Sequence, residues 1–173
     1  MAKQIINIDE LQFQEFPGQM SESARKKYGG TTMGFVGRLI GAKQLGYNVT
    51  VIPPGKGKAA FQFHNHRVNE EAFFILEGEG ECRIGAETYP VKKGDCIAHP
   101  AGGPETAHQI RNTSDTTPLK YLAISTLFPA EVAEYPDTRK FGILGRFTTA
   151  DGAEESWRFV GRPENGVDYF DGE

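Results

Sequence analysis

The chain has 173 residues, which is enough for one domain with a substantial hydrophobic core and cramped for two. Its 19 basic and 23 acidic residues give a formal charge of −4, a mild acidity that argues against binding to nucleic acid or an anionic membrane. The first residues lack the apolar core of a signal peptide, and no stretch approaches the length of a membrane span. We therefore expect a cytoplasmic protein, with Cys82 and Cys96 as reduced thiols in its core.

One helix and a series of short strands are predicted along the chain. The helix covers residues 20–28, with Ser21 as its N-cap. Strands are predicted at residues 46–52, 59–66, 71–77, 81–84, 88–91, 95–99, 107–111 and 120–126. Stretches rich in glycine and proline, such as "PPGKGK" and "PAGGPE", separate these strands and have the composition of turns. Many short strands joined by turns indicate an all-β sandwich or barrel.

The chain divides into a barrel and two flanking segments. We expect an N-terminal extension at residues 1–44, a barrel at residues 45–127 and a C-terminal arm at residues 128–173, all within a single domain. The arm contains enough aromatic residues to pack onto the barrel, and we expect Trp157 and Tyr169 to be packing residues.

Strand alternation predicts which side chains face the interior. One face of residues 59–66 and 71–77 carries Ala60, Gln62, His64, His66, Glu71, Phe73 and Ile75, and the other carries Phe61, Phe63, Phe74 and Leu76. Because both faces are apolar, the outer one must be covered by an arm or by a second subunit. We expect a homodimer.

Three histidines and a glutamate are predicted to converge inside the barrel. His64 and His66 lie two positions apart, so on a strand they point the same way. A turn then lets Glu71 open the next strand facing the same interior, and His108 begins another strand after a Gly/Pro turn. Three imidazoles and one carboxylate suit a single divalent transition metal, namely Fe, Mn, Zn, Ni or Cu.

These residues carry a resemblance to the cupin superfamily, whose fold is a double-stranded β-helix of the jelly-roll type. The first cupin motif falls on Gly57, His64, His66, Glu71 and Gly78, and the second falls on Gly94, Pro100, Gly102, His108 and Asn112. The main departure is an insertion of about three residues, "PET", before His108. The resemblance implies that His64, His66, Glu71 and His108 are the metal ligands.

The resemblance extends over roughly residues 38–145 and favours one group of bacterial single-barrel cupins. "LGYNVTVIPPGK", "EVAEYPDTRKFG" and the ending "DYFDGE" are similar to that group, some members of which are described as sugar-phosphate isomerases. This similarity implies the fold and the metal more directly than it implies a reaction.

Several other residues are candidates for the site. Glu70 could replace Glu71 as a ligand, although the spacing to Gly78 favours Glu71. His99 and Glu70 are candidate general acids or bases, and His99 could instead simply end a strand. Inside the barrel, Gln62 and Phe73 are candidate contacts for a substrate.

Two classes of function fit this pattern. The first is a metal-dependent enzyme acting on a small polar metabolite, either by isomerisation or epimerisation of a sugar or keto acid or by Fe(II)-dependent oxidation with O2. The second is a non-enzymatic barrel that binds or senses a small molecule. An open metal position in a pocket that excludes water favours the enzyme.

Overall fold

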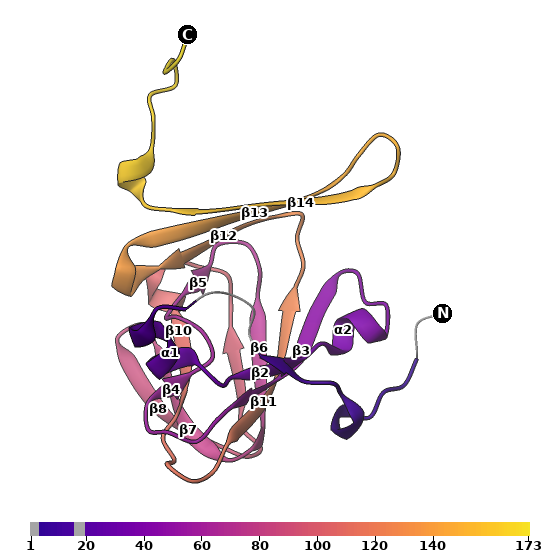
Figure 1. Cartoon of the computed structure of the whole chain (residues 1–173), viewed down its shortest axis with the longest axis vertical. Coiled ribbons are helices and arrows are strands. Elements are labelled where there is room, and N and C mark those ends of the chain that lie inside the picture. The colour runs from indigo at the N-terminus through magenta and orange to yellow at the C-terminus, as the bar shows by residue number, and fades with distance from the viewer. Residues whose placement is uncertain (1–3, 16–19) are drawn as a thin grey trace.

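The computed structural model describes residues 4–15 and 20–173, and β-strands make up most of its regular structure (Figure 1). One sheet has the strand order β1-β2-β3-β11-β6-β9. Its strands are β1 (Gln14–Glu15), β2 (Thr32–Gly34), β3 (Leu45–Ile52), β6 (Glu71–Glu77), β9 (Cys96–His99) and β11 (Leu119–Thr126). A second sheet has the order β4-β10-β7-β8 and comprises β4 (Lys58–Ala59), β7 (Glu79–Ile84), β8 (Glu87–Lys92) and β10 (His108–Asn112).

The chain passes repeatedly between these two sheets, which form the walls of the barrel. After β6 it enters β7 and β8 of the second sheet, returns to β9, crosses to β10 and ends in β11 between β3 and β6. The turn from β6 to β7 requires glycine, because Gly78 has φ of 82° and a Cβ there would collide with the carbonyl of Pro118. This antiparallel arrangement is the double-stranded β-helix that the sequence predicts.

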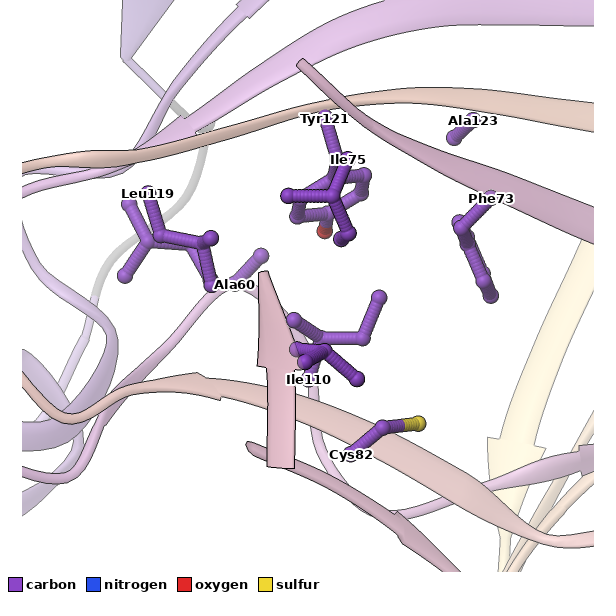
Figure 2. Packing of buried hydrophobic residues seen from close by; sticks show 10 residues of the cluster. Ala60, Phe73, Ile75, Cys82, Ile110, Leu119, Tyr121 and Ala123 are labelled. Atoms are coloured by element: carbon purple, nitrogen blue, oxygen red, sulfur yellow. The ribbon is translucent and has the colours of Figure 1, made fainter. Parts of the chain in front are cut away.

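The barrel core lies between the two walls (Figure 2). Ile52, Phe73, Ile75, Leu119, Tyr121 and Ala123 come from the first sheet and meet Cys82, Val91 and Ile110 from the second, together with Ala60. Burying each large apolar side chain of this kind contributes about 1.5–3 kcal/mol to folding. Asn112 ties the end of the barrel together, since its buried amide donates hydrogen bonds to the carbonyls of Pro53 and Thr117.

The N-terminal segment covers part of the outer face of the first sheet. It contains the 3-10 helix η1 (Ile8–Glu10), α1 (Glu22–Tyr28) and α2 (Val36–Leu39). Leu11 and Val36 bury Val49 and pack against Leu76 and Leu122, which point outward from β6 and β11. The apolar outer face is therefore partly covered by an arm, one of the two expected solutions. Helix α1 also matches its prediction, with the Ser21 hydroxyl accepting a hydrogen bond from the N–H of Ala24.

The C-terminal segment forms a third sheet with the order β14-β13-β12-β5. Its elements are β5 (Asn65–His66), β12 (Ala130–Tyr135), β13 (Lys140–Thr148) and β14 (Glu154–Gly161), and the chain also forms 3-10 helices η2 (Pro104–Thr106), η3 (Pro136–Thr138) and η4 (Pro163–Asn165). Strand β12 fastens the arm to the barrel by pairing with β5. The hairpin of β13 and β14 projects beyond the barrel, and the chain end leaves it (Figure 1).

Two expectations about packing were wrong. Trp157 is 52% exposed and Tyr169 is 90% exposed, because β14 pairs only with β13 and the residues beyond it lie on the surface. Cys96 is exposed rather than buried in the core, because it points outward from β9, whereas Cys82 is buried as expected.

The predicted strand at residues 59–66 is interrupted. Only β4 and β5 form at its ends, and the segment between them makes a single bridge from His64 to His108. Strict alternation therefore fails here: Phe63 is buried beneath the guanidinium of Arg83 instead of facing outward, and Phe61 packs against the core. No helix in the described part of the chain is long and apolar enough to cross a membrane.

Candidate metal centre

Two backbone hydrogen bonds fix the position of His64 beside His108. His64 exchanges two backbone hydrogen bonds with His108, so these residues from distant parts of the chain lie side by side. The Nδ1 atom of His64 lies 2.7 Å from the carbonyl oxygen of Gln62, which assigns the proton to Nδ1 and leaves the lone pair on Nε2. His66 lies on β5, with its ring centroid 5.0 Å from that of His64.

A carboxylate oxygen of Glu71 is the common contact of three imidazoles. Its Oε2 atom lies 3.0 Å from Nε2 of His108, 3.4 Å from Nε2 of His66 and 3.8 Å from Nε2 of His64. Glu71 opens β6 after the turn that follows His66, and it faces the barrel interior as the sequence predicts. The structure thus brings together all four residues proposed as ligands.

The insertion before His108 does not displace this histidine. Residues Pro104–Thr106 form the short helix η2, after which the chain resumes an extended path and enters β10 at His108. The helix takes up the extra length outside the strand, and the His108 side chain remains 3% exposed, at 3.0 Å from Glu71.

The four side chains border a cavity of about 200 Å³. Its other walls are mostly apolar, formed by Phe61, Phe73, Ile110, Tyr121 and Ala123, with Asn48 and Gln109 as polar contributors. The Gln109 amide already donates a hydrogen bond to the carbonyl of Phe61 at 2.7 Å. A ligand in this cavity would meet the imidazole and carboxylate cluster on one side and apolar surface on the other.

Burial and mutual contacts control the charges in the cluster. Burial, assisted by the neighbouring His108, lowers the pKa of His64 to about 4, so its imidazole is neutral at pH 7. Burial alone would raise the pKa of Glu71, but its hydrogen bonds with His108 and His66 outweigh that effect and hold the pKa well below its usual range. A neutral imidazole and an ionised carboxylate are the forms that bind metals.

The donor set fits a divalent transition metal. Ligand atoms of His64, His66 and Glu71 lie within 4.8 Å of one another, and His108 reaches the same carboxylate oxygen. The buried Nδ1 of His66 makes no hydrogen bond within the described chain, and its nearest carboxylate oxygen, from Glu131, is 3.8 Å away. Three imidazoles and a carboxylate suit Fe, Mn, Zn, Ni or Cu.

His99 and Glu70, the expected acid or base groups, do not line the cavity. His99 lies behind His108, with ring centroids 3.8 Å apart and planes inclined by 18°, and its Nε2 atom is 3.8 Å from the sulfur of Cys82. Burial lowers the pKa of His99 to about 3, so it is a neutral packing partner at pH 7. Glu70 is exposed and borders a different surface hollow, because the turn directs it outward while Glu71 points in.

The two expected substrate contacts lie in different places. Phe73 lines the cavity and packs its ring against those of His99 and His108. Gln62 does not face the interior: its side-chain oxygen accepts a hydrogen bond from Lys140 at 3.1 Å, in a hollow outside the barrel. The interruption of the strand at residues 60–64 turns Gln62 away.

Sequence reasoning missed the contribution of the C-terminal arm to this site. Glu131 of β12 is buried and accepts hydrogen bonds from the backbone N–H groups of Arg67, Val68 and Asn69, at 3.1, 3.3 and 2.6 Å. These bonds hold the turn between His66 and Glu71. Tyr135, at the end of the same strand, stacks on His64 with a centroid distance of 6.1 Å. Neither residue belongs to the two cupin motifs, although both lie in the stretch "EVAEYPDTRKFG", and the pairing of β12 with β5 brings them to the site.

Comparisons with known proteins agree with this architecture. The cupin domain family model matches residues 48–125, which include all four clustered residues. A sugar phosphate isomerase from a cupin superfamily, from Silicibacter pomeroyi, superposes with a TM-score of 0.72 at 24% identity, covering 96% of this chain and 98% of that chain. Residues 48–125 therefore match a cupin domain, and the fold is that of a single-barrel cupin.

Two curated relatives match part of the chain. An uncharacterised protein of Methanocaldococcus jannaschii is 44% identical over 62 residues, covering 36% of this chain and 46% of the relative. The oxalate-binding protein of Thermotoga maritima is 33% identical over 76 residues, covering 44% of this chain and 57% of the relative. The matches thus span about half the length of each curated relative.

Proposed function

We propose that this protein is a metal-dependent enzyme that isomerises a small polar metabolite. The observation that carries the proposal is the convergence of three Nε2 atoms within 3.8 Å of Oε2 of Glu71, beside a cavity of about 200 Å³. His64, His66, Glu71 and His108 would hold the metal. When bound there, a divalent metal supplies Lewis acidity to an oxygen of the ligand.

The remaining cavity residues bind and orient the substrate. Phe61, Phe73 and Ile110 provide apolar walls that exclude water and strengthen polar interactions inside the cavity. Tyr121 also lines the cavity, and burial raises the pKa of its phenol, so this side chain is neutral at pH 7 and can offer a hydrogen bond but cannot act as a base. The similarity to the Silicibacter pomeroyi sugar phosphate isomerase supports isomerisation as the reaction.

Oxidation of the substrate by O2 with Fe(II) is the second candidate. The observation that favours it is the composition of the cavity: among the described lining residues, none outside the four proposed ligands is a base at pH 7. Isomerisation needs a group that accepts a proton from carbon, whereas oxidation at an iron centre places no such demand on the surrounding side chains.

Elemental analysis of the purified protein tests the metal centre independently of activity. The matched variants are His64→Ala and His108→Ala, with Lys93→Ala as a control on the exposed turn after β8. We expect about one metal per chain in the wild type and in the control, and its loss in both histidine variants. A metal content that neither substitution reduces would refute the assignment of the ligands.

Solvent exchange and oxygen uptake then separate the reactions. The metal-loaded protein is incubated with a panel of aldoses, ketoses and keto acids, with and without phosphate, in D2O. Deuterium incorporation next to the carbonyl supports isomerisation, and O2 consumption by the Fe(II) form supports oxidation. A metal-loaded protein that binds a member of the panel without either reaction would instead support a binding or sensor protein.

A further inference from the structure

A second hollow adjoins the cavity at the candidate metal centre. It has a volume of about 320 Å³ and lies between α1, the interrupted segment around Phe61 and the C-terminal sheet. Phe61 and His64 border both spaces, so one side of the outer hollow is the wall of the inner cavity. A ligand that extends from the inner cavity past His64 would enter this outer hollow.

The outer hollow contains an unpaired cation. Arg158 on β14 lines it and forms no ion pair or side-chain hydrogen bond with any described residue. Arg158 lies opposite Leu144 in the hairpin of β13 and β14, which projects over this end of the barrel (Figure 1). None of the described residues that line the hollow is acidic, so nothing there neutralises the guanidinium.

A second cation contacts two of the residues that line the outer hollow. The ammonium group of Lys140, on β13, donates a hydrogen bond to the side-chain oxygen of Gln62 at 3.1 Å and lies 5.5 Å from the ring centroid of Tyr135. Gln62 and Tyr135 both line the outer hollow. A neutral amide is a weak partner for an ammonium group, and an anion entering the hollow would replace it with a stronger one.

We propose that Arg158 and Lys140 form a subsite for the phosphate group of a phosphorylated substrate, whose reacting end occupies the inner cavity. This inference rests on the proposed function, because it names the substrate class of the same enzyme. A planar guanidinium binds phosphate oxygens in pairs, and an ammonium adds a point charge. Two cations that form no ion pair with the described residues match the double charge of a phosphate monoester better than the single charge of a carboxylate.

Calorimetric titration with inorganic phosphate and with glycerol 3-phosphate tests the subsite on the full chain. The variants are Arg158→Ala and Lys140→Met. Lys93→Ala is the control for lost positive charge, and Lys56→Ala is the control for a separate cluster of lysines near α1. Each subsite substitution should weaken binding about tenfold or more, as expected for loss of a hydrogen bond to a charged group. Neither control should change it.

Three results would overturn the subsite. The first is phosphate binding that Lys56→Ala weakens and Arg158→Ala leaves unchanged, and the second is the absence of phosphate binding to a protein that carries its metal. The third is malonate binding as tightly as phosphate, which would assign the hollow to dicarboxylates.

Metal content is measured on the same samples, which keeps the two proposals separable. Phosphate binding that depends on Arg158 in a protein that takes up no metal would support the subsite and refute the metal enzyme. A metal-loaded protein without phosphate binding would do the reverse.

Discussion

Replacing Glu131 with glutamine is expected to loosen the turn that connects His66 to Glu71. The carboxylate accepts three backbone hydrogen bonds, the shortest being 2.6 Å from the N–H of Asn69, and it is only 5% exposed. Glutamine has one accepting oxygen, so its amide group would face an N–H group that it cannot satisfy. Leaving a buried donor unpaired costs about 1–3 kcal/mol, and the bonds that remain lose the assistance of the charge.

The expected loss is about 2–3 kcal/mol in the free energy of unfolding, which lowers Tm by about 5–10 °C for a chain of this size. Metal affinity should fall about 10–100-fold, since the turn positions two of the proposed ligands. Thermal unfolding of the metal-free protein and a chelator competition measure these two effects separately.

Glu134→Gln is the matched control for this experiment. Glu134 lies on the same strand and forms an ion pair at 2.9 Å with Arg67, whose side chain is 47% exposed. Its other carboxylate oxygen accepts a hydrogen bond from the buried amide of Asn65 at 2.9 Å, which the side-chain oxygen of glutamine can also accept. Loss of such a surface pair costs at most about 1 kcal/mol. If both variants lose the same small amount of stability and keep their metal affinity, Glu131 does not organise the turn.

Three further predictions concern the reactivity of the two thiols, the pH dependence of stability and the formation of a dimer. Burial raises the pKa of Cys82 to about 12, so a thiol reagent at pH 8 should modify only Cys96 in the native protein and both cysteines after denaturation; rapid reaction of both would contradict this. Because burial lowers the pKa values of His64 to about 4 and His99 to about 3, the unfolded chain binds protons between pH 6.5 and 4.5 that the folded metal-free chain does not. Each such histidine lowers stability by about 1.4 kcal/mol per pH unit as the pH drops below 6.5, and His66 offsets part of this loss, because its contacts with Glu71 outweigh burial and raise its pKa. Urea midpoints at pH 7.0, 5.5 and 4.5 measure the net loss, and a profile that stays flat or rises as the pH drops would show that His64 and His99 are not held neutral. Trp157 on the β13–β14 hairpin is 52% exposed and stacks on Phe159, and we expect a second copy of the chain to cover this aromatic face. Light scattering should therefore give a dimer that Trp157→Ser converts to a monomer. A monomeric wild type would refute the expectation.

Local sequence patterns predicted the barrel and brought four residues together as candidate ligands. Alternation over short runs placed most of the predicted strands within a residue or two, because glycine and proline punctuate them and each buried face repeats every second residue, but it did not predict β12, β13 and β14. The short spacing from His64 to Glu71 needs only one turn to bring three side chains to one point. His108 reaches the same point because the extra residues before it form η2 instead of lengthening the strand.

The same alternation failed where the chain left the sheet. Residues 60–64 make one bridge in place of a continuous strand. Phe61, Gln62 and Phe63 therefore do not face the sides of the sheet that strict alternation predicts for them. His99 was placed on the correct strand, but the stacking of its ring behind His108 depends on how the two walls of the barrel face each other.

What the sequence determined by itself is therefore the fold class, which follows from strand periodicity and turn composition, and the residues of the candidate centre, which follow from strand alternation and from the resemblance to the cupin motifs. Only the tertiary structure decided that Glu131 secures the turn after His66 and that Arg158 borders the adjoining hollow. These residues lie more than sixty positions from His66 along the chain. Their places are determined by the pairing of β12 with β5 and by the packing of the C-terminal sheet, which no local pattern of side chains encodes.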